Sequence, residues 1–232
     1  MDKEYNQKRI HPPIWQHDYL VLTRLYKILQ KIRDKYFLKK AILLDYGSGT
    51  APYKELLINH IEKYIGIDIS ANDGADIVIA ENEPIPLPNN SIDIVLSTQV
   101  LEHVKDVPFY LKEAYRVLKR DGIIIISTHG IWPYHPYPHD YNRWTRPGLI
   151  NILQSNGYKI LQIDSIIGPF ASATQFKALI LAERLIVKGI IGKMLLAVIA
   201  LTTNLKIFVE DKLFPPFKDQ DASVFVLCAR KI

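Results

Sequence analysis

The chain has 232 residues, of which 48% are apolar and 23% charged, a composition typical of folded domains and unlike that of disordered chains. The net charge of +5 is mild, and no RNA-binding aromatic motif or basic tail accompanies it, so we expect no nucleic-acid partner. The single cysteine, Cys228, excludes an internal disulfide and fits a reducing cytoplasm; its apolar neighbours predict a buried strand thiol.

The first forty residues are expected to form an N-terminal helical cap. Five apolar or aromatic residues recur there at steps of three and four, which is the pattern of one helix face: Leu22, Leu25, Leu29, Ile32 and Tyr36. Charges and prolines come early and no apolar stretch follows them, so no secretory signal is expected. The basic residues of this segment suit either a solvated helix face or attraction to an anionic membrane surface.

From residue 41 onward, short apolar runs alternate with helical patterns in one larger domain, 41–232. Strands are expected at 41–45, 64–70, 75–80, 91–98, 123–128, 158–167 and 223–232. Helices are expected at 52–63, 106–122 and 145–157, with Asp106 and Thr145 as N-caps and Gly157 as a terminator. This alternation is typical of an α/β fold with a parallel sheet covered on both faces.

An apolar helical insertion, about 168–217, separates the last two strands. Its longest uncharged run, 194–205, is too short to span a bilayer. The insertion could cover an acceptor site or form the face of a homodimer. It could instead dock on a membrane, because basic residues accompany the apolar ones: Lys177, Arg184, Lys188 and Lys193.

A glycine turn follows the first strand. Asp45 ends that strand, and Gly47 and Gly49 lack side chains, so backbone N–H groups can come close to a ligand. Asp68 ends the second strand, where a carboxylate can accept two ribose hydroxyl hydrogens. NAD and other nucleoside cofactors share these features. Pro52 stands where the dinucleotide motif has its third glycine, which argues against NAD, and no Gly-Lys-Ser/Thr follows to make a phosphate loop.

Five segments together resemble the class I S-adenosylmethionine-dependent methyltransferases, most of all the small bacterial methyltransferase type 11 group. They are "LLDYGSGTAPY", "YIGIDIS", "IPLPNNSIDIVLSTQVLEHV", "LKEAYRVLKRDGIIIIST" and "PHDYNRWTRPGLINILQSNGY". The resemblance covers about 43–167 and the last strand. It implies a Rossmann-like sheet of seven strands with the last one antiparallel, and methyl transfer from S-adenosyl-L-methionine to a small molecule.

The resemblance also implies which residues contact the cofactor: Asp45, Gly47, Ser48, Gly49, Asp68, Glu81, Asn82 and Gln99. The two glycines would pass closest to the methionine portion, and Asp45 would face its ammonium group through water. Asp68 would hold the ribose hydroxyls, and Glu81 would lie near the adenine edge.

The loop after the fifth strand offers a base, an acid and an aromatic wall near the acceptor: His135, Asp140, Tyr141, Arg143 and Trp144. It could line the substrate pocket, or it could be a rigid capping loop in which Asp140 pairs with Arg143. A metal site of His135, His139 and Asp140 is disfavoured because nearby prolines prevent the helix that would bring them together, so we expect no metal.

His139 or His103 is the candidate base for a hydroxyl or amine acceptor, although a histidine after a strand is often only hydrogen-bonded scaffold. The acceptor could be a saccharide or a lipid-linked metabolite, and the location cytoplasmic with or without membrane association. A non-catalytic methyltransferase-like binding protein and a nucleotide-sugar or NAD-dependent oxidoreductase remain as alternatives.

Overall fold

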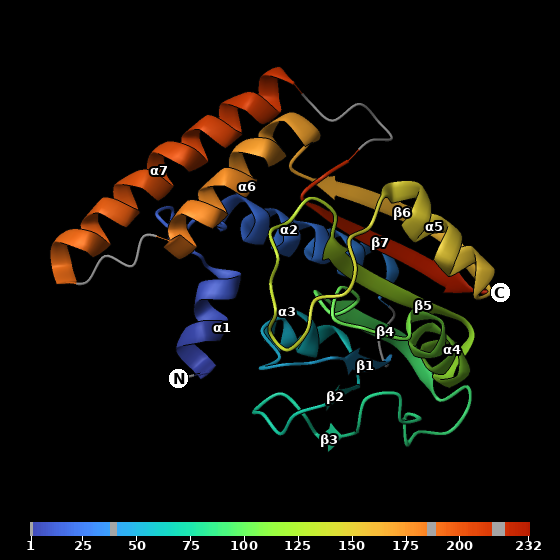
Figure 1. Cartoon of the computed structure of the whole chain (residues 1–232). Helices are drawn as coiled ribbons and strands as arrows, with labels where there is room; N and C mark the ends of the chain where they lie inside the picture. Colours follow the sequence, from blue (N-terminus) through green and yellow to red (C-terminus); the bar gives the residue numbers. More distant parts are fainter. Residues whose placement is uncertain (1, 38–40, 185–188, 215–220) are drawn as a thin grey trace.

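The computed structural model describes residues 2–37, 41–184, 189–214 and 221–232. Seven strands form one sheet in the order β3-β2-β1-β4-β5-β7-β6 (Figure 1). Their bounds are β1 Ile42–Tyr46, β2 Lys63–Asp68, β3 Ile77–Val78, β4 Ile92–Thr98, β5 Leu118–His129, β6 Tyr158–Ile166 and β7 Val224–Lys231. The first five strands pair in parallel, while β7 runs antiparallel to both β5 and β6. The predicted seven-stranded sheet with an antiparallel last strand is confirmed.

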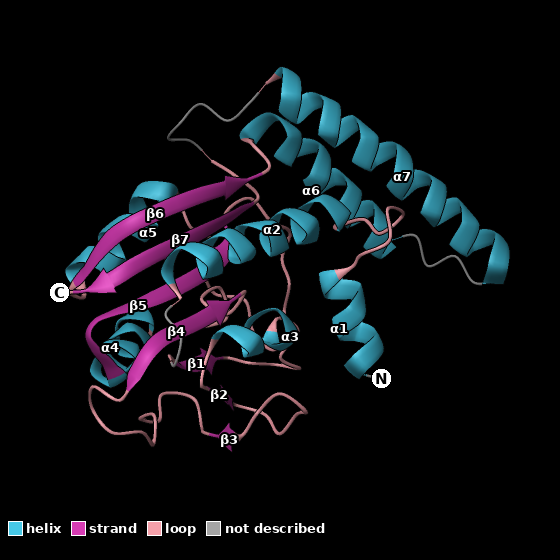
Figure 2. Cartoon of the chain, turned by 180° about the vertical axis from the view of Figure 1, so that it is seen from behind, coloured by secondary structure: helices cyan, strands magenta, loops and turns pink. Residues whose placement is uncertain are grey.

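Helices cover both faces of this sheet (Figure 2). They are α1 Asp2–Ile10, α2 Tyr19–Tyr36, α3 Lys54–Leu57 with the 3-10 helix η1 Ile58–His60, α4 Val107–Val117, α5 Arg146–Ser155, α6 Pro169–Arg184 and α7 Gly189–Leu213. Asp106 and Thr145 cap α4 and α5 as predicted, each accepting a hydrogen bond from the backbone N–H three residues on.

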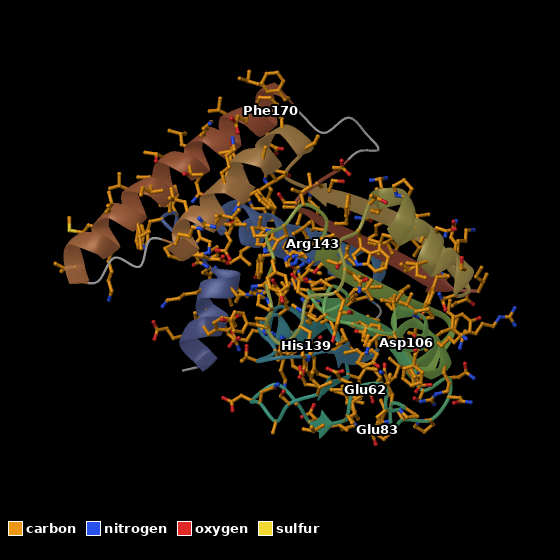
Figure 3. All side chains as sticks on the ribbon, in the orientation of Figure 1. Glu62, Glu83, Asp106, His139, Arg143 and Phe170 are labelled. Atoms are coloured by element: carbon orange, nitrogen blue, oxygen red, sulfur yellow. The ribbon has the colours of Figure 1, made fainter. Side chains whose placement is uncertain are left out.

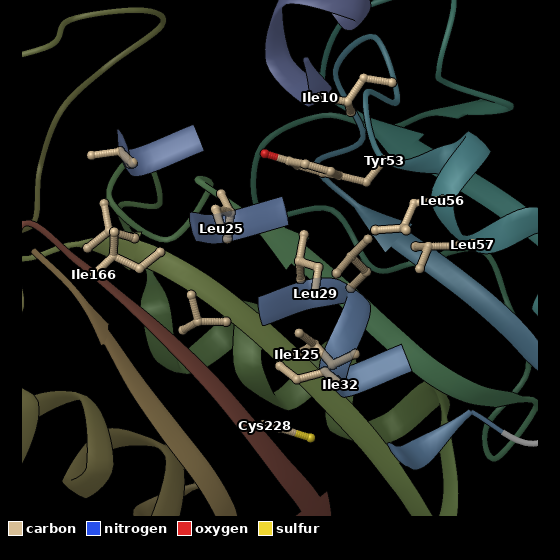
Figure 4. Close-up of a cluster of buried hydrophobic side chains, with 14 of the residues drawn as sticks. Ile10, Leu25, Leu29, Ile32, Tyr53, Leu56, Leu57, Ile125, Ile166 and Cys228 are labelled. Carbon is tan, nitrogen blue, oxygen red and sulfur yellow. The ribbon is translucent and has the colours of Figure 1, made fainter. Parts of the chain in front are cut away.

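One face of the sheet is covered by α2, whose apolar stripe is the one read from the sequence. Leu25, Leu29 and Ile32 point towards Ile125 of β5 and the sulfur of Cys228 (Figure 4). Burying each such side chain contributes about 1.5–3 kcal/mol. Burial also raises the pKa of the Cys228 thiol to about 12, as expected of a strand thiol in the core. The described part of the segment 1–40 therefore shares the main core.

The opposite face is covered by α4 and α5. Leu111 of α4 and Leu149 and Leu153 of α5 pack with Ile124 and Ile126 of β5. Because side chains alternate along a strand, β5 supplies Ile125 to one core and its two neighbours to the other. This strand therefore has both faces buried, in agreement with the prediction of a sheet covered on both faces.

Two expected helices are shorter in the structure. The helix expected at 52–63 is reduced to α3 and η1, because Ile61 is extended and leads directly into β2. The helix expected to run to residue 122 ends at Val117, because Leu118 is already extended and pairs with Ile92 of β4. Strand pairing overrides helix propensity at both places.

The insertion between β6 and β7 contains two helices, α6 and α7, and both views show α7 outermost with α6 beneath it (Figures 1 and 2). By length and composition alone, Gly192–Leu213 is long and apolar enough to cross a membrane, although its longest uncharged run, 194–205, is too short to do so. The expectation counted uncharged residues alone, whereas the helix continues through Lys206.

Candidate active site

A cavity of about 590 Å³ lies at the carboxyl ends of β1, β2, β4 and β5. Parallel α/β sheets bind ligands at this edge. The volume lies within the range of sites that hold a cofactor or a small substrate. Of the predicted cofactor residues, all but Asp45 line it: Gly47, Ser48, Gly49, Asp68, Glu81, Asn82 and Gln99.

The glycine turn is tied to the ends of two strands. The N–H groups of Gly47 and Ser48 donate to the carbonyl of Ile67, at 2.8 and 3.0 Å. The Gly49 N–H donates to one Asp68 carboxylate oxygen at 2.7 Å, and the Ser70 N–H donates to the other at 3.1 Å. Each oxygen keeps a further lone pair for a hydroxyl donor. Asp68 therefore both holds the turn and offers acceptors at the cavity wall.

The two glycines of the turn are required for different reasons. Both have positive φ, +84° at Gly47 and +52° at Gly49. A Cβ at Gly47 would lie 2.6 Å from a methyl of Val100, whereas a Cβ at Gly49 would meet nothing within 4 Å. The space beside Gly49 is thus open cavity, and a side chain there would occupy it. This open space leaves room for a ligand such as S-adenosylmethionine beside the turn.

Two of the residues with an unusual backbone conformation line the same cavity. Asn82 and Gln99 line it with φ of +58° and +57°, which side-chain-bearing residues rarely adopt. Gln99 is held there by its N–H, which donates to the Ser127 carbonyl at 2.8 Å, and by its side-chain amide, which donates to the Ser127 hydroxyl at 3.1 Å. Such conformations cluster at ligand sites because the surrounding structure must enforce them.

Asp45 does not belong to the described cavity wall. Its side chain lies on the same sheet face as Leu43 and accepts a hydrogen bond from the Tyr64 hydroxyl. Its second oxygen, Oδ1, has no hydrogen-bond partner among the described residues. Burial raises the pKa of Asp45 to about 7. A water-mediated contact with the cofactor's ammonium group stays a prediction.

The buried Asp45 carboxyl predicts a pH dependence of stability. Because the pKa is raised, the neutral Asp45 carboxyl stabilises the fold fully at a pH below its ordinary pKa of 3.8. This contribution to the free energy of unfolding is lost as the pH rises through about 7. We expect the stability of the wild type relative to Asp45→Asn, measured by urea denaturation, to fall by about 3 kcal/mol between pH 5 and pH 8. The variant Asp34→Asn, at an exposed position, should keep the wild-type pH profile. An unchanged pH profile in Asp45→Asn would refute the assignment.

Three histidines from the carboxyl-end region of β4 and β5 line the same cavity: His103, His129 and His135. Their rings lie close together, with centroids 5.9 Å apart for His103 and His135 and 6.4 Å apart for His129 and His135. His129 also stacks on Trp132, with centroids 4.5 Å apart. The sequence interpretation missed His129, although it ends β5 at the edge where Asp68 ends β2.

Glu102 lies buried beside His129. One carboxylate oxygen is 3.1 Å from the His129 Nδ1, and the other accepts a hydrogen bond from the Thr128 hydroxyl at 2.8 Å. Burial raises the pKa of Glu102 and holds the pKa of His129 well below its usual range. The His129 ring is therefore neutral near pH 7, with a carboxyl group beside its Nδ1.

The loop after β5 is braced by Arg143. Its guanidinium forms two hydrogen bonds with Asp140, at 2.5 and 2.6 Å. The remaining N–H groups donate to the backbone carbonyls of Trp132, Pro133 and Asn142. All five N–H donors of the Arg143 side chain are used within the loop. The pairing of Asp140 with Arg143 is the one expected of a rigid capping loop.

Only His135 of the five predicted substrate residues lines the main cavity. Asp140, Tyr141 and Arg143 lie in a separate depression of about 280 Å³, and Trp144 packs against the core under α5. His139 lies on the same loop as Arg143 (Figure 3) and is not part of the described wall of the main cavity. Asp140 and Arg143 pair with each other within the loop, whereas a role of these residues in binding the acceptor stays a prediction.

The N-terminal helix α1 adds a wall that the sequence did not indicate. The Asn6 amide donates to the Thr50 carbonyl at 2.6 Å and accepts from the Thr50 hydroxyl at 2.5 Å, which fastens α1 to the glycine turn. Tyr5 and Arg9 thereby come to line the cavity. Within the described residues, no group of three or more His, Cys, Asp or Glu side chains is arranged to hold a metal ion.

Residues 44–126 match a family model described as "Methyltransferase domain". This segment is a methyltransferase domain, and its curated relatives include S-adenosylmethionine-dependent methyltransferases. The match spans the glycine turn, Asp68 and the strands up to Ile126. It leaves the oxidoreductase alternative without support.

Among curated relatives of this methyltransferase domain is the ubiquinone biosynthesis O-methyltransferase of Pelagibacter ubique, 25% identical over 159 residues, 56% of this chain and 66% of that protein. A malonyl-[acyl-carrier protein] O-methyltransferase of Yersinia pestis is 32% identical over 96 residues, 38% of this chain and 36% of that one. The matched part of the chain thus spans two thirds or less of the length of these relatives. An S-adenosylmethionine-dependent methyltransferase structure from Mesorhizobium loti shares the fold, with a TM-score of 0.59 and 15% identity over 91% of this chain and 100% of that one.

Proposed function

We propose that this chain transfers the methyl group of S-adenosylmethionine to a hydroxyl or amine of a small molecule. One observation carries the proposal: a single cavity is lined by the glycine turn and Asp68 and also by the histidines His103, His129 and His135. Two of its relatives are named as O-methyltransferases, which supports an oxygen acceptor. The location would be cytoplasmic.

When bound, S-adenosylmethionine supplies a methyl group that its sulfonium already activates, so the protein mainly has to align the acceptor and exclude water. Asp68 would accept the ribose hydroxyls through its remaining lone pairs, and the open space beside Gly49 would receive the methionine portion. Asn82 and Gln99 would contact the nucleoside and sulfonium regions through backbone held at positive φ.

His103 is better placed than His139 to accept a proton from the acceptor. The His103 Nδ1 contacts the backbone carbonyl of His139, which can only accept, so Nδ1 carries the hydrogen in the neutral ring. Nε2 then carries the lone pair, and His103 lines the cavity. His139 instead has its Nε2 3.9 Å from a Glu81 oxygen at the cofactor end. The neutral His129 beside Glu102 would orient the acceptor.

A transfer assay tests this function. The wild-type chain, radiolabelled S-adenosylmethionine and panels of hydroxyl- and amine-bearing saccharides, phenols and lipid-linked metabolites are incubated, and S-adenosylhomocysteine is measured. We expect turnover with one acceptor class and a loss of about 10²–10⁴ in turnover for His103→Ala, with His139→Ala within a few-fold of wild type.

Two outcomes would contradict this. If His103→Ala keeps wild-type turnover, base catalysis by His103 is wrong. If the wild-type chain binds S-adenosylmethionine and yields no more S-adenosylhomocysteine with any panel than Asp68→Asn does, the non-catalytic binding protein is the better description.

A further inference from the structure

The outer face of α7 carries an apolar stripe without a partner in the described structure. Six large side chains recur along it at steps of three and four, each between 42% and 77% exposed: Ile190, Met194, Val198, Leu201, Leu205 and Phe208. Monomeric proteins rarely leave such a continuous apolar surface in water. The one polar group within this stretch of the face, the Thr202 hydroxyl, donates back to the helix carbonyls of Val198 and Ile199 at 3.0 Å.

The inner face of α7 is bound to the rest of the domain by polar contacts. The Asn204 amide donates to the carbonyls of Ile14 and Gln16, each at 2.8 Å. Asp211 accepts from the Gly168 N–H at 2.7 Å and pairs with Arg24 at 2.5 Å. A helix anchored in this way cannot cross a bilayer without breaking these contacts, so its length indicates a helix that lies along a surface.

The charges on α7 are sorted by face. Its exposed ionisable side chains are all cations, Lys193 near its start and Lys206 and Lys212 near its end. Its two carboxylates, Glu210 and Asp211, are turned inward, with side chains 14% and 11% exposed. Glu210 pairs with Lys206 at 3.6 Å. Apolar residues with cations around them complement an anionic lipid surface.

A second copy of the chain fits this face less well. A two-fold contact would place the face against itself, because such interfaces are self-complementary. Lysines would then meet lysines with no exposed carboxylate of the described α7 residues to pair with them.

We propose that the outer face of α7 docks on an anionic membrane surface, with the helix lying in the plane of the interface. The apolar stripe enters the boundary between headgroups and acyl chains, and the lysines contact lipid phosphates. The helix beneath it, α6, contributes Leu179 and Glu183 to the cavity wall, so the docked surface lies one helix away from the methyl-transfer site.

Vesicle flotation with the full chain tests this proposal. The vesicles are pure phosphatidylcholine or phosphatidylcholine with about 30% phosphatidylglycerol, and binding is expected only to the anionic ones and to fall with added salt. Lys193→Glu with Lys212→Glu, and separately Leu205→Asp, should each lower the bound-to-free ratio at least about tenfold. Circular dichroism and the midpoint of thermal unfolding report whether each variant is folded.

Matched controls separate docking from general charge or surface effects. Lys112→Glu with Lys159→Glu changes the net charge equally on exposed positions of α4 and β6, and Ile58→Asp places a carboxylate at a position 40% exposed on η1. Both should bind vesicles like the wild type. If Leu205→Asp does not fold, the double lysine variant of α7 and its control variant still test whether the α7 face binds the vesicles.

Three results would overturn the proposal. In the first, the wild-type chain stays with the lipid-free fraction. In the second, the control lysine pair weakens vesicle binding as much as the α7 lysine pair does. In the third, the wild-type chain is a dimer that does not bind vesicles, and Leu205→Asp dissociates it.

Discussion

Gly49→Ala is expected to leave the domain folded and to weaken binding of S-adenosylmethionine at least about thirtyfold. The new methyl group meets no protein atom within 4 Å, and the φ of +52° costs about 1 kcal/mol, which a folded domain tolerates. The same methyl group enters the space in which we place the methionine portion. Displacing a well-packed ligand from such a space costs about 2 kcal/mol or more, which is about thirtyfold in affinity.

Gly47→Ala is the matched control, because it should fail in the opposite way. Its Cβ would lie 2.6 and 2.7 Å from the two Val100 methyl groups, at a φ of +84°. We expect a loss of about 2–4 kcal/mol in the free energy of unfolding, from overpacking and backbone strain together. Urea denaturation and calorimetric titration with S-adenosylmethionine distinguish the two variants. A Gly49→Ala protein that binds within threefold of wild type would show that the ligand does not lie against the turn.

Asp68→Asn is expected to weaken S-adenosylmethionine binding about hundredfold or more. Hydrogen bonds to a charged group contribute about 1.5–3 kcal/mol each, and the ribose would make two of them. An asparagine also replaces one carboxylate oxygen by an NH₂ group, which cannot accept the hydrogen bond of either Gly49 or Ser70. Affinity is measured by calorimetry at a pH near 7.

Asp76→Asn controls for the loss of a carboxylate near the same loop. Asp76 accepts a hydrogen bond from the Gly66 N–H at 2.8 Å and is exposed outside the described cavity wall. This variant should bind S-adenosylmethionine within about threefold of wild type, since it loses no hydrogen bond to the ligand. Equal losses in both variants would mean that Asp68 acts only by holding the loop.

The cofactor end of the cavity could be read from the sequence because strand ends determine it. An apolar run followed by a turn places Gly47 and Asp68 at the same sheet edge, whatever the loops do. The same reasoning could have found His129, which ends β5 at that edge. Asp45 shows the limit of this approach: side-chain alternation turns its carboxylate to the Tyr64 side, two residues before the turn begins.

The acceptor end could not be read in the same way because loops and distant segments form it. The charges of Asp140 and Arg143 suggested a pocket, yet they satisfy each other and the loop backbone. Sequence spacing does not reveal which donors a folded-back loop will meet. Nor could it bring Arg9 to the cavity, because the hydrogen bonds between Asn6 and Thr50 join residues 44 apart in the chain.

A crystal structure of the chain with S-adenosylhomocysteine tests the central claim most directly. We predict that both ribose hydroxyls lie within hydrogen-bond distance of the Asp68 carboxylate, and that the amino-acid portion lies against the backbone at Gly47 and Gly49. Density for the nucleoside elsewhere, or a ribose whose hydroxyls contact neither Asp68 oxygen, would contradict the account.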